Sequence, residues 1–484
     1  MYALPLDIFR IMAGLLCAAY FATLALQAQD FSNPDGLLDH ALLHRIFWFT
    51  RLSLFHPGLS LAFFYGIFGL AFVGAWGIVL GYRVKLCAAA LFLIAVSTYR
   101  WNFIVIYVDD GFMHLLLFWL MFLPVGHTLC LPDFLASPLA RRWRWAHLTV
   151  PGTAARCFLC NVSLVYLLAG LWKLESPLWR QGFALYAALH LPVAYTPEFW
   201  GPQHLPWLQV ANHFALIIEP LIPLLLWWRR DHPLKWCGLF CQIGFHVAIL
   251  STFKIPFVNL GLMATALLFF QAEIVQRLCR PWRPSPIQQR PRLDPAGRYA
   301  LVFLLVLSLA VMRRIPLLGV FHKPAYALLW TVGIAQDYHL FNWIDKVNYH
   351  VTYRVIIQSH TGAQQSLAPS TLFPSSLRAS LLQAYLYNVR WMFIPRQHRL
   401  ALRQSILARS AQRFCRKHTQ DGIVTAWSRV QRILPDNPHL SRGEERFLLT
   451  FRCEEKRAVL CSTFLEQLHR TDCEPSARPT LSGT

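Results

Sequence analysis

Ionisable side chains inside long apolar runs are the residues of this chain best suited to do chemistry. They are Arg100, Asp109, Asp110, His114, Lys173, His213, Glu219 and His246. Each such group costs roughly 2.5–3.5 kcal/mol to place in lipid, so it normally faces a protein interior and has partners. Burial disfavours the charged amine of Lys173, which could then act as a general base. We predict Lys173 as the catalytic residue, and the others as pocket lining or proton shuttles.

Simpler interpretations exist for several of these side chains. Lys173 could extend its amine to water at the outer membrane interface. Single histidines such as His213 and His246 are commonly hydrogen-bonded core residues. Glu219 precedes Pro220 in mid-run, where a carboxylate must be paired or protonated. His213 and Glu219 are six positions apart and do not share a helix face, so we expect no metal site.

The elements that position these side chains are apolar runs long enough to cross a bilayer, which takes roughly 20 residues. The chain is 56% hydrophobic and 14% charged, against roughly 25% charged for soluble domains. We predict an all-α membrane bundle of about nine helices. The predicted spans are 8–28, 58–80, 86–107, 112–131, 157–174, 205–228, 236–253, 256–272 and 299–313. A further run, 316–335, is broken by His322, Lys323 and Pro324, so we predict an interfacial or re-entrant segment.

Every second loop between the predicted spans is rich in arginine and lysine, whereas the alternate loops carry aspartate and glutamate. Basic loops remain cytoplasmic, which predicts a cytoplasmic N-terminus in the inner (plasma) membrane. After nine crossings the C-terminal part is extracytoplasmic, and a tenth crossing would reverse this. In this topology the ionisable side chains of five spans lie at a similar depth. We therefore predict a cavity that opens to the outer face.

Charge becomes dense after about residue 335, which divides the chain into a transmembrane domain, 1–335, and a C-terminal domain, 336–484. Residues 349–357 (YHVTYRVII) predict a strand, and 376–416 and 441–470 predict helices. The last ten or so residues are predicted to be disordered. This gives a small mixed α/β domain. Its cysteines could pair in an oxidising compartment, in a pattern that the sequence leaves open: Cys415, Cys453, Cys461 and Cys473.

Residues 164–189 (LVYLLAGLWKLESPLWRQGFALYAAL) resemble the lysine segment of vitamin K-dependent γ-glutamyl carboxylase and of the wider HTTM group of bacterial membrane proteins. Residues 245–259 (FHVAILSTFKIPFVN) are similar to the family's Phe-His helix and Phe-Pro turn. Residues 330–369 are similar to its passage from Trp-x-x-Gly into a β segment. Lys173 falls on the family's proposed base. The resemblance implies a reduced quinone cofactor, with O2 and CO2 if carboxylation carries over.

One motif departs from the carboxylase pattern. The carboxylase has Asn-Asn-His at the start of its fourth span, whereas this chain has Asp109-Asp110-Gly111, with His114 one turn further on. This is closer to the bacterial HTTM pattern. It leaves quinone chemistry open and argues against protein carboxylation.

We therefore favour a membrane enzyme that uses Lys173 on a quinone-like or lipid-soluble substrate from the outer side. An alternative is a non-catalytic scaffold or maturation factor whose basic outer domain binds a secreted peptide or protein. A transporter is less favoured, because the inner halves of the spans are nearly free of charge. The net charge of +21 is spread over loops and the C-terminal part without an aromatic-basic module, so the expected partners are membrane lipids and not nucleic acid.

Overall fold

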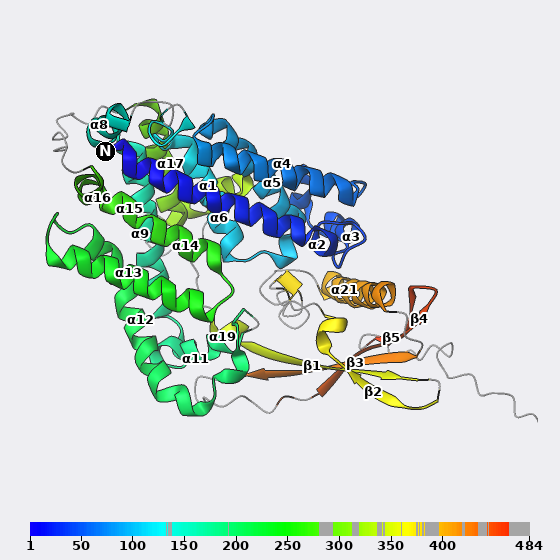
Figure 1. The fold of residues 1–484 in the computed structure, drawn as a ribbon. Coiled ribbons are helices and arrows are strands. Elements are labelled where there is room, and N and C mark those ends of the chain that lie inside the picture. Colours follow the sequence, from blue (N-terminus) through cyan, green and yellow to red (C-terminus); the bar gives the residue numbers. More distant parts are fainter. Residues whose placement is uncertain are drawn as a thin grey trace, which may run out of the picture.

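The computed structural model describes residues 1–131, 138–191, 193–279, 294–311, 319–335, 344–359, 361–373, 396–418, 422–433 and 445–463, with isolated positions 133, 341, 376, 378, 379, 382 and 443. The described chain is mostly helical. A bundle of helices is followed by an antiparallel sheet with one long helix beside it (Figure 1).

Six helices of the described residues are long and apolar enough to cross a membrane. They are α1 (Ala3–Leu26), α4 (Leu61–Leu80), α5 (Val84–Trp101), α9 (Thr153–Lys173), α12 (Leu205–Leu226) and α13 (Pro233–Thr252). Each overlaps a predicted span. Much of their surface is exposed and apolar, as lipid-facing helices require. The prediction of a multi-pass membrane protein is thus supported, while the count of nine crossings stays a prediction.

The other predicted spans form shorter or broken helices. The run 112–131 gives α6 (Val108–Phe122), which begins earlier and ends sooner than predicted. The run 256–272 becomes α14 (Pro256–Ala264), α15 (Ala266–Phe269) and α16 (Gln271–Leu278), bent by 76° at the break before Gln271. The run 299–313 gives α17 (Pro295–Val311), and the run 316–335, predicted to be interfacial or re-entrant, gives α18 (Gly319–Val332); the two helices pack together.

Short helices connect these elements. They are α2 (Ala28–Phe31), α3 (His40–Ile46), α8 (Pro138–His147), α10 (Pro177–Gln181), α11 (Ala184–Leu189), α19 (Ile344–Val347) and the 3-10 turns η1 (Trp48–Leu52), η2 (Phe103–Val105), η3 (Pro197–Phe199), η4 (Pro202–His204) and η5 (Pro369–Thr371).

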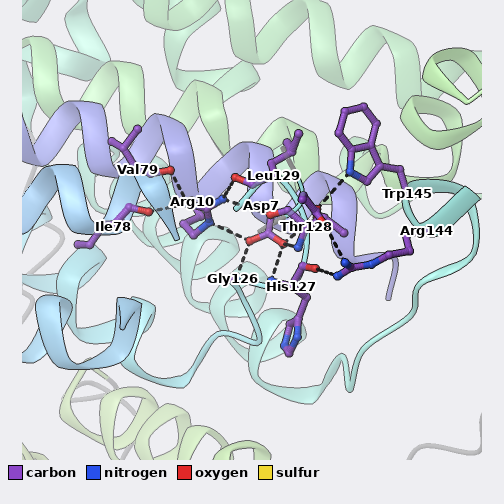
Figure 2. A network of polar contacts seen from close by, with 11 residues as sticks. Asp7, Arg10, Ile78, Val79, Gly126, His127, Thr128, Leu129, Arg144 and Trp145 are labelled. Atoms are coloured by element: carbon purple, nitrogen blue, oxygen red, sulfur yellow. Dashed lines mark hydrogen bonds and ion pairs between the residues drawn. The ribbon is translucent and has the colours of Figure 1, made fainter. Parts of the chain in front are cut away.

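Asp7 and Arg10 fix α1 in the bundle through a buried polar network (Figure 2). The two side chains form an ion pair of 2.9 Å one helical turn apart. Asp7 accepts the backbone N–H groups of residues 126–128, while Arg10 donates to the carbonyl oxygens of residues 78, 79 and 129. The network therefore ties α1 to the end of α4 and to the segment after α6.

The C-terminal part forms one five-stranded antiparallel sheet in the order β2–β1–β3–β4–β5. The strands are β1 (Tyr349–Gln358), β2 (Gln364–Leu367), β3 (Ile423–Arg432), β4 (Glu445–Glu454) and β5 (Arg457–Thr463). The predicted strand at 349–357 is confirmed by β1. Helix α21 (Arg396–Lys417) confirms the later part of the predicted helix 376–416 and contacts β4 and β5. A disulfide joins Cys415 of α21 to Cys453 of β4, and Cys473 lies outside the described residues.

The prediction of a helix over 441–470 is wrong for residues 445–463, which form the β4–β5 hairpin; 464–470 lie outside the described residues. Glu455 and Lys456 make its two-residue turn with φ angles of 46° and 65°. Two successive positive φ angles suit the twist of a hairpin, and Asn-Gly or Asp-Gly is the usual sequence there. Because Glu-Lys is neither of these pairs, the sequence carries no such signal for the turn. The predicted disordered end lies outside the described residues.

The strands β1–β5 and helix α21, called the sheet domain below, pack against one end of the helical bundle. The core of this domain contains Phe451, Val355 and Phe414 together with Phe31 of α2 and Val105 of η2. Polar contacts join the same parts: α21 lies beside the loop segment 30–39, which it reaches with three side chains, Ser405, Arg409 and Arg413. The N-terminus lies beside α8 and α16, away from the sheet (Figure 1).

Candidate functional site

Lys173 and Glu219 form a buried ion pair between α9 and α12. The distance from Lys173 Nζ to Glu219 Oε2 is 2.5 Å, and the side chains are 4% and 5% exposed. Lys173 is the last residue of α9, and its Nζ lies 5.4 Å from the ring centre of Trp179. The amine therefore points into the protein, and the interpretation that it extends to water is wrong for this structure.

A glycine lets the two helices approach closely enough for this pair. A Cβ atom placed on Gly170 would lie 2.6 Å from Cδ of Pro220, a distance that carbon atoms do not tolerate. Gly170 lies one turn before Lys173, and Pro220 follows Glu219. The Ala169–Gly170 pair thus allows a close helix approach, as small residues commonly do at membrane helix contacts.

A second polar chain connects Tyr166, His246 and Asn259. His246 Nδ1 lies 2.7 Å from Asn259 Oδ1, and Nε2 lies 2.5 Å from the Tyr166 hydroxyl oxygen. The Asn259 amide NH2 donates to the Ile255 carbonyl, which leaves its oxygen to accept. His246 Nδ1 therefore carries the proton, and Nε2 accepts the Tyr166 O–H. Gln242 Nε2 donates to the Tyr166 oxygen at 3.2 Å, which completes the chain.

These two groups line one cavity of about 110 Å³. Its other walls are aliphatic and aromatic side chains: Val108, Val165, Leu185, Ile249, Ile255, Phe253, Val258 and Leu262. Asn212 supports the site from behind, since its amide binds the Trp179 carbonyl and accepts the Leu185 N–H. The cavity thus combines a mainly apolar wall with a few fixed polar groups, as ligand sites usually do.

Of the residues predicted from the sequence, the structure brings together Lys173, Glu219 and His246. His213 lies on an exposed face of α12 and does not line the cavity. Asp109 accepts the Val258 N–H from α14, a contact that joins α6 to that helix.

The three other predicted residues lie elsewhere. Asp110 pairs with Arg378 of the C-terminal part. Arg100 and His114 line a different cavity. One cavity was expected to hold all these side chains. In the described part of the chain, some of them line one cavity, some line another, and the rest line neither.

Several residues of the site were not predicted: Tyr166, Asn212, Gln242 and Asn259. They are neither acidic, basic nor imidazole side chains, so a search for those groups passes over them. Amide side chains within apolar helices are a usable signal, because lipid offers them no hydrogen bonds.

The partner of Lys173 changes the chemistry expected of it. A neutral amine was expected from apolar surroundings, but in the structure the Lys173 amine is hydrogen-bonded to the Glu219 carboxylate. The two groups share one exchangeable proton, which can lie on either partner of the hydrogen bond between them. In both arrangements the pair can accept one more proton, which ends as a protonated amine beside a protonated carboxyl group. The unit can therefore act as a base without either residue changing position.

Comparison of the chain with protein-family models, curated proteins and solved structures finds no match to any of them.

Proposed function

We propose that this chain is an integral membrane enzyme in which the Lys173–Glu219 pair takes a proton from a quinone-like or other lipid-soluble substrate. The observation that carries the proposal is the position of this ion pair, which borders an apolar cavity within helices suited to a membrane. Buried ion pairs are weak sources of stability, and ionisable groups within membranes commonly mark functional sites.

The side chains around the cavity suit a ring compound with polar groups at one edge. The volume of the cavity is small for such a compound. A cavity of about 150 Å³ takes up benzene, so a quinone ring would enter the 110 Å³ found here only if wall side chains move. Val165, Ile249 and Leu262 would hold its apolar surface, and Lys173 or Tyr166 its oxygens. A reduced quinone would supply an acidic hydroxyl group and reducing equivalents. The similarity to the HTTM group belongs to this proposal, and we assign no carboxylation.

The proposed topology has a cytoplasmic N-terminus and an extracytoplasmic sheet domain. The Cys415–Cys453 disulfide supports it, because stable disulfides form mainly in oxidising compartments. The sheet domain also lies away from the N-terminus, which is near the basic helix α8. A substrate dissolved in the outer leaflet would then reach the cavity from the side of the sheet domain.

Replacing Lys173 tests this proposal. Full-length protein in nanodiscs would be mixed with reduced menadione under air, and oxidation followed by the absorbance of the quinone. We expect faster oxidation than in empty nanodiscs, and Lys173→Met to lower the enzyme-dependent rate by about 100-fold or more, the usual contribution of a general base.

Lys235→Met is the matched control for this experiment. Lys235 forms a second buried lysine–glutamate pair, with Glu273 at 3.1 Å, and does not line the Lys173 cavity. Its loss should leave the rate unchanged. Glu219→Gln carries the same test as Lys173→Met if that variant fails to fold. An unchanged rate in folded Lys173→Met, or no rate above empty nanodiscs in the unmodified protein, would contradict the proposal.

The scaffold alternative draws less support from the structure. It needs a basic C-terminal surface that is free to bind a partner. Arg409 and Arg413 of α21 instead bind Asp39 and Asp30 of the bundle loops. These arginines hold the sheet domain in place.

A further inference from the structure

A second cavity, of about 230 Å³, lies between the ends of α5 and α18 and the first turns of α6. It shares no lining residue with the Lys173 cavity. The lining residues on which the inference rests are Phe49, Tyr99, Arg100, Gly111, His114 and Trp330. The proposed base plays no part here, so an inference about this cavity stands apart from the proposed function.

Arg100 brings a positive charge to this cavity. Its guanidinium group is half-buried and donates to the carbonyl oxygens of Leu52, at 2.9 Å, and Thr331. These carbonyls carry no charge to balance it, and Arg100 forms no ion pair within the part of the chain that the structure describes. A guanidinium has five N–H groups. Two are used by the carbonyls, so others remain for an anion.

His114 adds a buried polar group with unused bonding capacity. Its Nδ1 lies 3.2 Å from the Gly333 carbonyl oxygen, which can only accept, so Nδ1 carries the proton. The other nitrogen, Nε2, is then an acceptor. It has no hydrogen-bond partner among the described residues. A ligand that offers both an oxyanion and a hydroxyl group would match Arg100 and His114 together once a movement of the cavity wall opens Nε2, which is enclosed by protein in this structure.

Aromatic rings form much of the remaining wall. Trp330 meets Phe49 edge to face, with ring centres 4.9 Å apart, and Tyr99 meets His114 at 5.0 Å. The half-buried guanidinium lies beside these rings, which shield part of it from water and so strengthen its attraction for an anion. Its planar fork also matches two oxygens of one phosphate group.

We propose that this cavity binds a phosphate group, with Arg100 as its cation. The phosphate could belong to a lipid head group or be free in solution. Both sources offer the same oxyanion and, when singly protonated, the same hydroxyl group. The two can be separated by the ligand used in the test.

Gly111 allows the cavity to be filled without damage to the fold. It lies in α6, and a Cβ atom placed on it would have no other atom within 4 Å. Gly111→Leu should therefore extend into open space at the cavity. Gly244 of α13 also has open space around its added Cβ and does not line this cavity, which makes Gly244→Leu a matched control.

The experiment is calorimetric titration of the full-length protein in detergent micelles with three probes. These are inorganic phosphate, dihexanoyl phosphatidic acid and dihexanoyl glycerol, which lacks the phosphate. We expect saturable binding of a phosphate-bearing probe and none of dihexanoyl glycerol. Arg100→Gln should weaken binding by about tenfold or more, as expected for lost hydrogen bonds to a charged group. Gly111→Leu should abolish binding, and Gly244→Leu should leave it unchanged.

Each outcome bears on the proposal. Binding of both phosphate probes would show that free phosphate suffices, and binding of phosphatidic acid alone would identify a lipid head group. Equal binding of dihexanoyl glycerol and phosphatidic acid would overturn the proposal, because the phosphate would then be irrelevant. Unweakened binding to Gly111→Leu, or no binding of either phosphate probe to the unmodified protein, would also overturn it.

Discussion

His40 begins helix α3 and is enclosed by protein, with its ring stacked on Trp101 at 3.9 Å between centres. Its Nε2 donates to the Phe31 carbonyl at 2.8 Å, so the neutral ring is already satisfied on that side. A second proton would sit on Nδ1, which has no hydrogen-bond partner among the described residues. Burial consequently lowers the pKa of His40 to about 3.

This lowered pKa predicts a loss of stability in mild acid. Between the ordinary histidine pKa of about 6.5 and the folded value, the unfolded chain binds a proton that the folded chain does not. Stability therefore falls as the pH falls through this window. From pH 7 to pH 5 the loss is about 2 kcal/mol from this group alone.

His40→Phe keeps an aromatic ring on Trp101 and removes the titration. The melting temperature, measured in detergent at pH 7 and pH 5, should then fall less than in the unmodified protein. His56→Phe serves as the control, because His56 is exposed. Equal acid sensitivity of His40→Phe and the unmodified protein would show that His40 does not titrate as described.

At the scale of single residues, part of the site could be predicted from the sequence and part could not. Lys173, Glu219 and His246 stand out because a charge or imidazole interrupts an apolar run. Tyr166 and Asn259 hardly disturb hydropathy, and their pairing depends on which faces of distant helices meet. Only the folded chain decides that.

At the scale of elements, the long helices could be predicted from the length of the apolar runs, whereas the β4–β5 hairpin could not. About 20 apolar residues in a row have few solutions other than a membrane helix, because lipid cannot satisfy an open backbone. The β4–β5 segment has weaker preferences. Its first strand, β4, is fixed by pairing with β3 and by the disulfide to α21, both of which lie outside the segment itself.

The contact between α9 and α12 gives a prediction at this scale. Gly170→Ala places a methyl group 2.6 Å from Pro220 Cδ and 3.1 Å from its nitrogen, so the helices must separate. Overpacking of this kind costs about 1–3 kcal/mol. We expect a lower melting temperature and, since these helices carry Lys173 and Glu219, a slower menadiol oxidation.

Gly69→Ala in α4 is the control for the helix contact. No atom lies within 4 Å of an added Cβ there, and alanine suits a helix better than glycine. This variant should melt at the same temperature as the unmodified protein or slightly higher. If Gly170→Ala also melts at the temperature of the unmodified protein, the close approach of α9 and α12 does not require glycine at position 170.

At the scale of the whole molecule, one buried arginine joins the sheet domain to the bundle. Arg378 binds both oxygens of Asp110, at 2.6 and 3.1 Å, and the carbonyl of Val105. Asp110 also accepts the hydroxyl proton of Tyr20 in α1, at 2.8 Å. This link is central to the assembly because Asp110 lies in the first turn of α6, beside Gly111 of the Arg100 cavity and close to Val108 of the Lys173 cavity.

Breaking this link should lower the stability of both the sheet domain and the bundle. Arg378→Met leaves the Asp110 carboxylate buried without its cation, which typically costs about 3–5 kcal/mol. Arg378→Met combined with Asp110→Asn removes both charges and should recover part of that loss. The exposed pair Arg354–Glu445 provides the matched control, because surface pairs contribute about 0–1 kcal/mol. Melting temperatures and protease sensitivity of the sheet domain measure the effect. If Arg378→Met behaves like Arg354→Met in both, the buried pair does not join the two parts.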